Sequence, residues 1–423
     1  MKHRKYTTAL IFFGMTAALG IHQAAHADDD WVIEVTKQGI TNPHQVAITP
    51  FVGNQAMSEL TLATLKQTDL KISNQNLPST PATASAVLDN IYVWRNTGYR
   101  YVVVGDSHAI LGNKIATNVH IIDLAAAKPL GERFTHISGD DPEQIKAAAN
   151  AIGAKIYAMI TGASFDMTGK IAYVEEMGDA IYKTSALKVM DVATQSSRTI
   201  DTVQGAILTP TFSPDGRTIA YTVLTNHALP VIYQYQLDGG QKTLLTPFKG
   251  SNLSPAFSAD GNTLLFSGSH ENDNPNIYAL DLTANRLHAI TIQQGAENSP
   301  SYLPNGQIIF TADNGSRSQS IYRMSAGGKP VRIASGSSPK VSKDGKKLAY
   351  TQGGNLMVAN IDGSQALSVA SIGTEGMASF SPTGTSIVYA SQGGELIIRS
   401  LSGQQMMRLP TQGKAKDPVW SVR

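Results

Sequence analysis

The chain of 423 residues contains no cysteine and few charged residues. The missing cysteine excludes disulfide bonds, a thiolate nucleophile and a cysteine-type zinc site. Charged side chains account for 16% of the residues and the formal net charge is +2, so the sequence lacks the broad basic field that is typical of nucleic-acid binding. Beyond the N-terminus, no apolar run approaches the roughly 20 residues of a bilayer-spanning helix. Stability must therefore come from a large hydrophobic core.

The N-terminus has the layout of a secretory signal peptide. Three basic residues among the first five precede an apolar run at 9–19, and Ala25-His26-Ala27 supplies the small residues of a cleavage site. The apolar run is too short for the alternative, a membrane anchor. Cleavage of residues 1–27 would remove the three basic residues and change the formal charge from +2 to −1. Export without disulfide bonds is typical of a bacterial periplasm, where we expect the protein.

Six segments of the chain repeat one phrase, in which an aromatic or apolar strand is followed by a turn that ends in glycine and by a second apolar strand. The turn glycines are separated by 47, 45, 45, 39 and 39 residues, a period that suits one four-stranded propeller blade. The phrases lie at 165–174, 212–222, 257–267, 302–311, 341–351 and 380–390, and they carry the turn glycines Gly169, Gly216, Gly261, Gly306, Gly345 and Gly384.

A third strand and a poorer fourth strand follow the phrase in each unit, which predicts six blades of four antiparallel strands. The C-terminus ends on Asp417-Pro-Val-Trp-Ser421, which matches the start of an inner strand, as in Thr209-Pro-Thr-Phe-Ser213, but the rest of a blade is missing. This orphan strand is best used to complete the first unit and to close the ring. We therefore predict a six-bladed β-propeller over 159–423, closed by the C-terminal strand.

The preceding segment, 28–158, mixes strands and helices and is predicted to form an N-terminal α/β domain. Asp141-Pro142 is a strong helix start, with a helix that ends at Gly153 or runs on towards Met159. The expected strands are 32–36, 46–49, 70–73, 101–104 and 120–124, and the other expected helices are 54–68 and 84–94.

In combination, these features resemble the TolB family of periplasmic proteins, part of the Tol–Pal cell-envelope system. The resemblance rests on the signal peptide, on Val46-Ala-Ile-Thr-Pro-Phe51 and Tyr101-Val-Val-Val-Gly105, on Ile171-Ala-Tyr-Val174 and on the repeated turns such as Phe212-Ser-Pro-Asp-Gly216. It implies a monomeric, non-enzymatic adaptor without a cofactor, which supports outer-membrane integrity and constriction at cell division. The propeller would bind the lipoprotein Pal and the mature N-terminal segment would bind TolA. The resemblance also implies that colicins use these surfaces in some bacteria.

An antiparallel propeller has two unlike faces. The turn face carries the uniform connections between first and second strands, and the loop face carries the varied connections between second and third strands and between blades. Varied loops on a rigid scaffold are where recognition tends to occur, so we expect Pal to dock on the loop face, over the mouth of the channel. The predicted contacts are Ile207, Leu208, His227, Ser251, Asn252, Glu297, Asn298 and Met377.

The mature N-terminus has two interpretations. Asp28, Asp29 and Asp30 precede Trp31, Val32, Ile33 and Glu34, whose alternating pattern suits a strand that pairs with a partner's sheet. The same residues could equally form the first strand of the α/β domain. The resemblance implies the former, a TolA-binding segment.

The main alternative function is an exported propeller enzyme, either a hydrolase or a small-ligand lyase. The nearest string to a hydrolase motif, Gly105-Asp-Ser107-His-Ala109, lacks the second glycine of the nucleophile elbow, and we expect it to form a loop after Val104. Two acidic segments, His270–Asn274 and Glu175-Glu176 with Asp179, are expected to be solvated loops rather than metal sites. No nucleotide-binding motif is present.

Overall fold

The computed structural model describes residues 45–178, 184–270, 274–292, 295–313, 318–374, 376–401 and 406–421. The predicted signal peptide, the predicted strand at 32–36 and the predicted TolA-binding segment at 28–34 lie outside the described residues.

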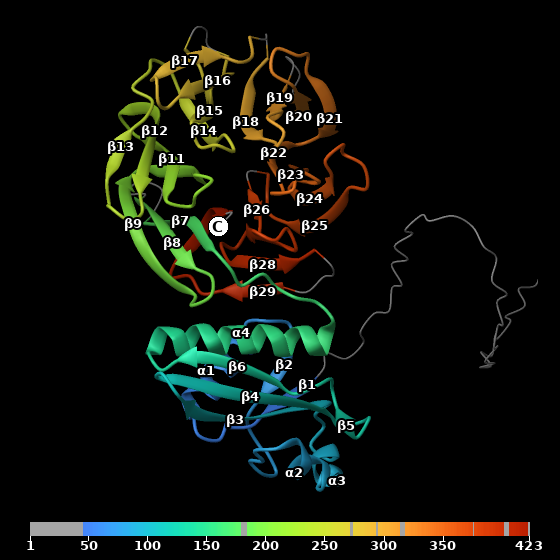
Figure 1. Cartoon of the computed structure of the whole chain (residues 1–423). Coiled ribbons are helices and arrows are strands. Elements are labelled where there is room, and N and C mark those ends of the chain that lie inside the picture. The colour runs from blue at the N-terminus through green and yellow to red at the C-terminus, as the bar shows by residue number, and fades with distance from the viewer. Residues whose placement is uncertain are drawn as a thin grey trace, which may run out of the picture. The chain divides into compact units, whose positions relative to one another are not determined.

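The first part is a six-stranded sheet with helices (Figure 1). β1 runs parallel to β2 and β3, and the order across the sheet is β2-β1-β3-β4-β5, with β6 also paired to β4. The strands are β1 (Gln45–Ile48), β2 (Lys71–Ser73), β3 (Tyr101–Ile110), β4 (Lys114–Asp123), β5 (Lys128–Pro129) and β6 (Phe134–Gly139). The helices are α1 (Gln55–Lys66), α2 (Ala84–Leu88), α3 (Ile91–Arg95) and α4 (Pro142–Thr161).

The long helices begin where the sequence predicts. The Asn54 side chain accepts a hydrogen bond from the backbone of Met57 at the start of α1, and Asp141 accepts one from Gln144 at the start of α4. α4 runs past Gly153 and ends at Gly162, whose φ of 77° suits a helix C-cap.

Two local predictions were wrong. The expected helix at 84–94 is two short helices, α2 and α3, separated at Asp89 and Asn90. The expected loop after Val104 is strand, because β3 continues to Ile110 and pairs along its whole length with β4. The polar residues of β3 misled the prediction, since strands with one solvated side alternate polar with apolar residues.

The second part is a ring of six four-stranded sheets, as predicted. Blades 1 to 5 follow the chain, and blade 6 combines β30 from the C-terminus with β7, β8 and β9. Blade 1 is β10 (Ala206–Phe212), β11 (Thr218–Thr225), β12 (Ala228–Gln236) and β13 (Lys242–Leu244). Blade 2 is β14 (Asn252–Phe257), β15 (Thr263–Gly268), β16 (Asn276–Asp281) and β17 (Arg286–Ala289). Blade 3 is β18 (Glu297–Tyr302), β19 (Ile308–Ala312), β20 (Ser320–Met324) and β21 (Val331–Ser335).

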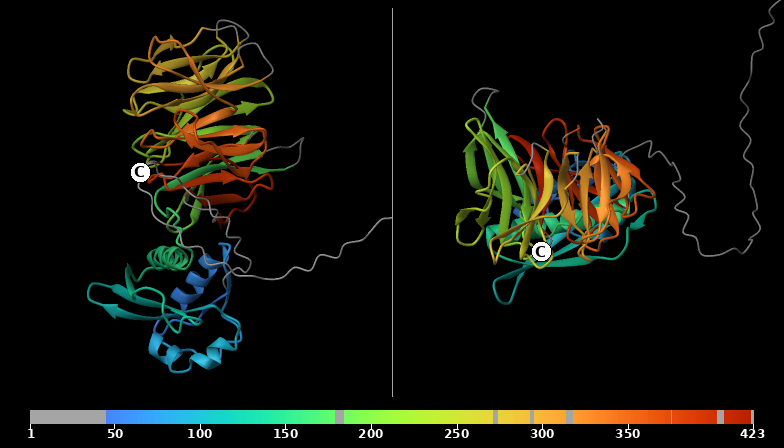
Figure 2. Two further views of the ribbon diagram at one scale, coloured as in Figure 1. Left: turned by 90° about the vertical axis from the view of Figure 1, so that its right-hand side faces the viewer. Right: turned by 90° about the horizontal axis from the view of Figure 1, so that it is seen from above.

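Blade 4 is β22 (Ser337–Val341), β23 (Lys347–Gln352), β24 (Asn355–Asn360) and β25 (Leu367–Ser371). Blade 5 is β26 (Ala378–Phe380), β27 (Ser386–Ala390), β28 (Leu396–Ser400) and β29 (Met406–Leu409). Blade 6 is β30 (Lys414–Trp420), β7 (Lys170–Met177), β8 (Thr184–Asp191) and β9 (Ser196–Gln204). The C-terminal end of the described chain lies at the turn face (Figure 2).

The repeated phrase folds the same way in blades 1, 2 and 4. In blade 1 the Ser213 hydroxyl donates a hydrogen bond to Asp215, and Asp215 accepts another from the backbone of Arg217. Gly216 follows with φ of 71°, a left-handed conformation that glycine adopts without strain. Equivalent bonds join Ser258 to Asp260 and Ser342 to Asp344. The phrase is thus a self-contained turn and offers no groups for chemistry.

The turn of blade 6 departs from the common phrase because Asp166 joins two blades. Its carboxylate accepts hydrogen bonds from the backbone and hydroxyl of Thr168 in its own turn, and from the backbone and hydroxyl of Thr383 in the turn of blade 5. Blade 5 has Thr383 where the turns of blades 1, 2 and 4 have aspartate, and Asp166 supplies a carboxylate to it.

The ring closes through β30, which pairs antiparallel with β7 from Lys414 to Trp420. At its start, the buried Glu175 carboxylate accepts hydrogen bonds from the backbones of Gln412 and Gly413, at 2.9 and 3.1 Å. Lys188 lies 2.5 Å from the other oxygen of Glu175. This confirms the predicted closure by the C-terminal strand.

The α/β part packs on blades 5 and 6. One hydrophobic cluster combines Leu65 of α1 and Ile152 of α4 with Ile398 of β28 and Met407 of β29. At its edge, the backbone of Arg408 donates a hydrogen bond to the carbonyl of Gln67. This contact leaves the loop face over the channel free of the α/β part.

Candidate functional site

The mouth of the channel on the loop face is built by two stacked rings of inner-strand residues. Each of the six blades contributes the same two consecutive positions. The outer ring is Leu208, Leu253, Asn298, Ser337, Gly376 and Lys416, and the inner ring is Thr209, Ser254, Ser299, Ser338, Met377 and Asp417. All twelve residues line one cavity.

Five of the six inner-ring residues have left-handed backbones. Thr209, Ser254, Ser299, Ser338 and Asp417 have φ between 46° and 56°, and each precedes a proline. Because proline has no N–H to give to the ladder, the register shifts there, and each inner strand forms a bulge. In blade 5, Met377 takes this position and no proline follows.

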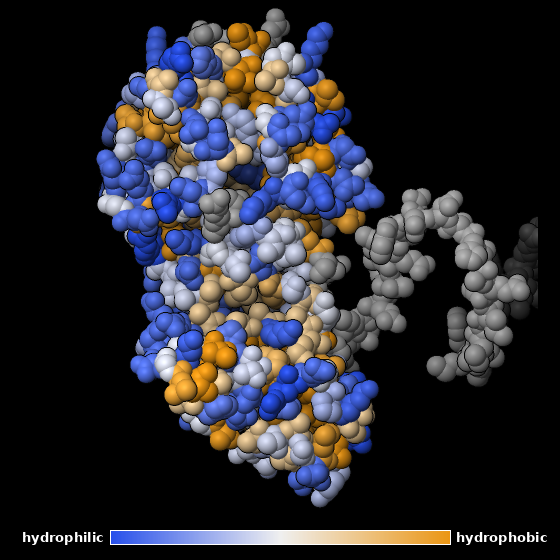
Figure 3. Space-filling view, viewed as in Figure 1, coloured by the Kyte–Doolittle hydropathy of each residue, from blue (hydrophilic) through white to orange (hydrophobic). Residues whose placement is uncertain are grey.

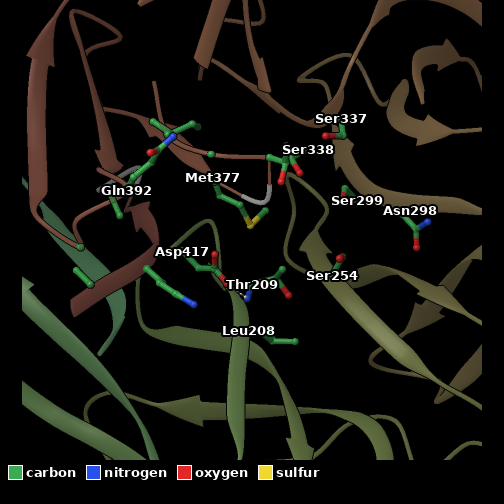
Figure 4. A pocket seen from close by; sticks show the side chains of 18 of the residues that line it. Leu208, Thr209, Ser254, Asn298, Ser299, Ser337, Ser338, Met377, Gln392 and Asp417 are labelled. Carbon is green, nitrogen blue, oxygen red and sulfur yellow. Dashed lines mark hydrogen bonds between the residues drawn. The ribbon is translucent and has the colours of Figure 1, made fainter. Parts of the chain in front are cut away.

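The cavity has a volume of 660 Å³ and a lining of mixed polarity (Figure 4). Blades 3 and 4 contribute mainly hydroxyl and amide groups. Blade 6 contributes charges from β7 and β30. The apolar contacts come from Leu208, Leu253, Ile372 and Met377.

The turn face is the one seen in Figure 3, where most of the propeller surface is hydrophilic.

The charges of blade 6 are largely committed to one another. Lys416 and Glu176 form an ion pair at 2.8 Å, and Asp417 accepts a hydrogen bond from the backbone of Thr209 at 3.0 Å. Burial raises the pKa of the Asp417 carboxyl and lowers the pKa of the Lys340 ammonium, and the two groups interact through their opposite charges. This attraction reduces the pKa shift of both groups. The mouth is therefore polar without presenting a strong field of one sign.

Three of the eight predicted contacts line the cavity: Leu208, Asn298 and Met377. Two more, His227 and Ser251, lie away from it. His227 is exposed in the turn between β11 and β12, and Ser251 bonds through its backbone to the Ser269 hydroxyl.

The other three predicted contacts, Ile207, Asn252 and Glu297, are at most 2% exposed and do not line the cavity. The Asn252 amide donates hydrogen bonds to backbone carbonyls of its own loop, that of Gly250 among them. Glu297 bonds to the Thr291 hydroxyl, and burial raises the pKa of its carboxyl against the opposing effect of that bond. They precede the outer ring by one residue, and since strand side chains alternate, they point into the blades. Their burial does not agree with direct contact to a partner.

Sequence reasoning missed most of the rings. The signal was present, since a Ser, Thr or Asp followed by proline recurs two residues before the end of five inner strands. These dipeptides mark the bulges on the inner strands.

The candidate hydrolase site does not assemble. The Ser107 hydroxyl is buried and shares a hydrogen bond with Thr117, whereas His108 lies on the exposed side of β3 with its Nδ1 atom 3.5 Å from Asp106. Glu175 and Glu176 are strand residues of β7, not loop residues as predicted, and Asp179 and residues 271–273 lie outside the described residues. Among the described residues, no three His, Asp or Glu side chains could hold a metal together.

Fold and site together define a class of protein, a six-bladed β-propeller behind an α/β region, with a wide mouth of mixed polarity. Among the described residues, no helix has the length and hydropathy of a membrane span. A family model described as the TolB beta propeller domain matches residues 157–423.

Known proteins agree with that match. The chain is 33% identical over 433 residues to the Tol-Pal system protein TolB of Actinobacillus succinogenes, covering 98% of this chain and 96% of the relative. It is 30% identical over 241 residues to TolB of Acinetobacter baylyi, where the match covers 57% of this chain and only 55% of the relative. The crystal structure of TolB from Acinetobacter baumannii superposes with a TM-score of 0.71 at 27% identity, over 90% of this chain and 97% of that one. The chain belongs to the TolB family of the Tol-Pal system.

Proposed function

We propose that this protein is a non-enzymatic, periplasmic adaptor that binds Pal over the mouth of its propeller and TolA through its mature N-terminal segment. Through these partners it supports outer-membrane integrity and envelope constriction at cell division. The relatives are named Tol-Pal system proteins, which supports Pal as the partner. The protein would reach the membrane only through its partners.

The observation that carries the proposal is the cavity of 660 Å³ at the mouth. Protein interfaces commonly have a small apolar centre inside a polar, wet rim. Leu208 and Met377 provide such a centre, and the hydroxyl groups of blades 3 and 4 provide part of the rim. The six blades hold these residues on rigid inner strands, so little ordering entropy opposes binding.

Replacing Leu208 with aspartate is expected to weaken Pal binding about tenfold or more, because an unpaired carboxylate would be buried at the interface centre. Calorimetric titration with purified Pal measures the change. Leu244→Asp is the matched control, since Leu244 belongs to the same blade but is 40% exposed on its outer strand. Equal affinity of both variants for Pal would mean that the mouth is not part of the Pal-binding site.

Deleting Asp28 to Trp31 is expected to abolish capture of purified TolA while leaving the melting temperature nearly unchanged. The support is the sequence pattern, in which three acidic residues precede an alternating segment of the kind that adds to a partner's sheet. The melting temperature is the control. A large drop in it would assign the segment to the fold of the α/β domain instead.

A further inference from the structure

The rim around the mouth has unequal heights. In blade 1 the hairpin of the second and third strands is long. From the pair of Ala220 and Gln234 the two strands continue, paired, as far as Thr225 and Ala228. In blade 4 the equivalent hairpin is shorter. From the pair of Ala349 and Val358 the strands continue only to Gln352 and Asn355, which are joined by a two-residue turn of Gly353 and Gly354. In a ring of six blades, blades 1 and 4 lie opposite each other (Figure 1). The rim is therefore high on one side and low on the other.

In the other blades, the rim is not lowered in the way that it is at blade 4. The connections of blades 2 and 3, at 269–275 and 313–319, are longer in sequence than that of blade 4, and β7 of blade 6 runs on to Met177. Blade 5 has a connection of intermediate length at 391–395, but its residues Ser391, Gln392 and Gly394 line the mouth itself.

A second cavity lies across the low side of the rim. It has a volume of 310 Å³ and is lined by Gln319, Ser335, Gly336, Ser337, Thr351, Gln352, Gly353, Gly354 and Thr374. Gln319, Ser337 and Thr374 line the mouth cavity as well, so the two cavities adjoin each other at these residues. We call this second cavity the blade 4 trough.

The lining of the blade 4 trough suits a polypeptide backbone. It contains amides, hydroxyls and glycines and no charged residue. The side-chain amides of Gln319 and Gln352 are exposed, and neither has a hydrogen-bond partner among the residues that the structure describes. An amide group donates and accepts, as the backbone of an unpaired peptide requires.

Glycine keeps the trough open. At Gly336, φ is 141° and an added Cβ atom would lie 2.5 Å from the carbonyl oxygen of Thr351, so no other residue fits without strain. Gly353 and Gly354 both have positive φ, at 55° and 79°, as a tight two-residue hairpin turn requires. At these three positions of the lining no side chain narrows the trough.

We propose that an extended segment of the partner bound at the mouth leaves it through the blade 4 trough, held by backbone hydrogen bonds to Gln319 and Gln352. The inference rests on the proposed function, in which Pal occupies the mouth. An extended chain is narrower than a helix, which with its side chains is about 10–12 Å wide, and its backbone groups are free to bond to the two amides. The high wall of blade 1 blocks the opposite direction.

The test places the photo-crosslinking residue p-benzoylphenylalanine at position 352, in full-length mature protein, with purified Pal as the probe. We expect a crosslink to Pal from position 352 and none from position 262, where exposed Asn262 lies on the turn face. Gln352→Trp should narrow the trough and weaken Pal binding about tenfold or more by calorimetry, whereas Asn262→Trp should leave the affinity unchanged.

The outcomes separate the two proposals. Failure of the unmodified protein to bind Pal would overturn the proposed function. Normal Pal binding that is weakened by Leu208→Asp, with no crosslink from position 352 and no effect of Gln352→Trp, would overturn the trough alone. A crosslink from 352 that maps to one contiguous segment of Pal would support it.

Discussion

Replacing Glu175 with alanine is expected to destabilise the propeller by about 3 to 5 kcal/mol, the range for removing one partner of a buried ion pair. Glu175 is fully buried, and its carboxylate holds Lys188 and the backbones of Gln412 and Gly413. The variant would leave the Lys188 ammonium buried with only the Gln412 side chain, at 3.0 Å, as its partner. It would also release the turn that leads into the closing strand. Urea unfolding of the mature protein measures the loss.

Matched variants isolate the reason. Lys188→Met alone leaves a buried carboxylate without its cation, so it should destabilise more than the double variant Glu175→Gln/Lys188→Met, which removes both charges. Glu395→Gln breaks the exposed pair of Glu395 and Arg408, at 3.2 Å, and should change stability by no more than about 1 kcal/mol. A Glu175→Ala loss as small as that of Glu395→Gln would contradict the closing role of the pair.

The same pair predicts the direction of a pH effect. Burial alone would raise the pKa of Glu175, but the Lys188 ammonium and two backbone N–H groups outweigh it and lower the pKa. A carboxyl with a lowered folded-state pKa contributes stability above its unfolded pKa and loses it as pH falls through the folded value. Wild type should therefore lose more stability than Glu175→Gln on acidification below about pH 4.3, the ordinary glutamate value.

The sequence was sufficient for the ring because the information is local and repeated. Each turn such as Ser213–Gly216 satisfies its own polar groups, so a short phrase marks a blade wherever it occurs. The contacts that vary between blades were beyond reach. Asp166 bonds to Thr383, 217 residues away, and nothing in either segment alone indicates that one carboxylate serves two turns.

Three of the eight predicted contacts line the mouth cavity, and the binding role of that face stays a prediction. Choosing residues near the start of each inner strand found Leu208, Asn298 and Met377, but it also included Asn252 and Glu297, which point into the blades. Side-chain direction in a strand depends on register, and a single bulge reverses it. The proline dipeptides signal a bulge, but the residues between which the register shifts follow only from the pairing of two strands.

At the other end of the closing strand, replacing Trp420 with alanine is expected to destabilise the protein by about 3 to 5 kcal/mol. Trp420 is 2% exposed, pairs with Ile171 and donates a hydrogen bond from its indole to the carbonyl of Thr168 at 2.8 Å. The melting temperature and the urea midpoint measure the loss. Tyr92→Ala is the control, because Tyr92 is 67% exposed and its removal should change stability by no more than about 0.5 kcal/mol.

Combining the two changes tests whether closure is a single event. Glu175 holds the beginning of β30 and Trp420 holds its end. If one substitution already opens the ring, the second substitution should lower the free energy of unfolding by less than it does alone. The double variant Glu175→Ala/Trp420→Ala should therefore lose clearly less stability than the two single losses added together. Additive losses would mean that the two ends of β30 are held independently. Because the inner-ring residue Asp417 belongs to the same strand, cooperative closure would also tie the shape of the mouth to the integrity of the ring.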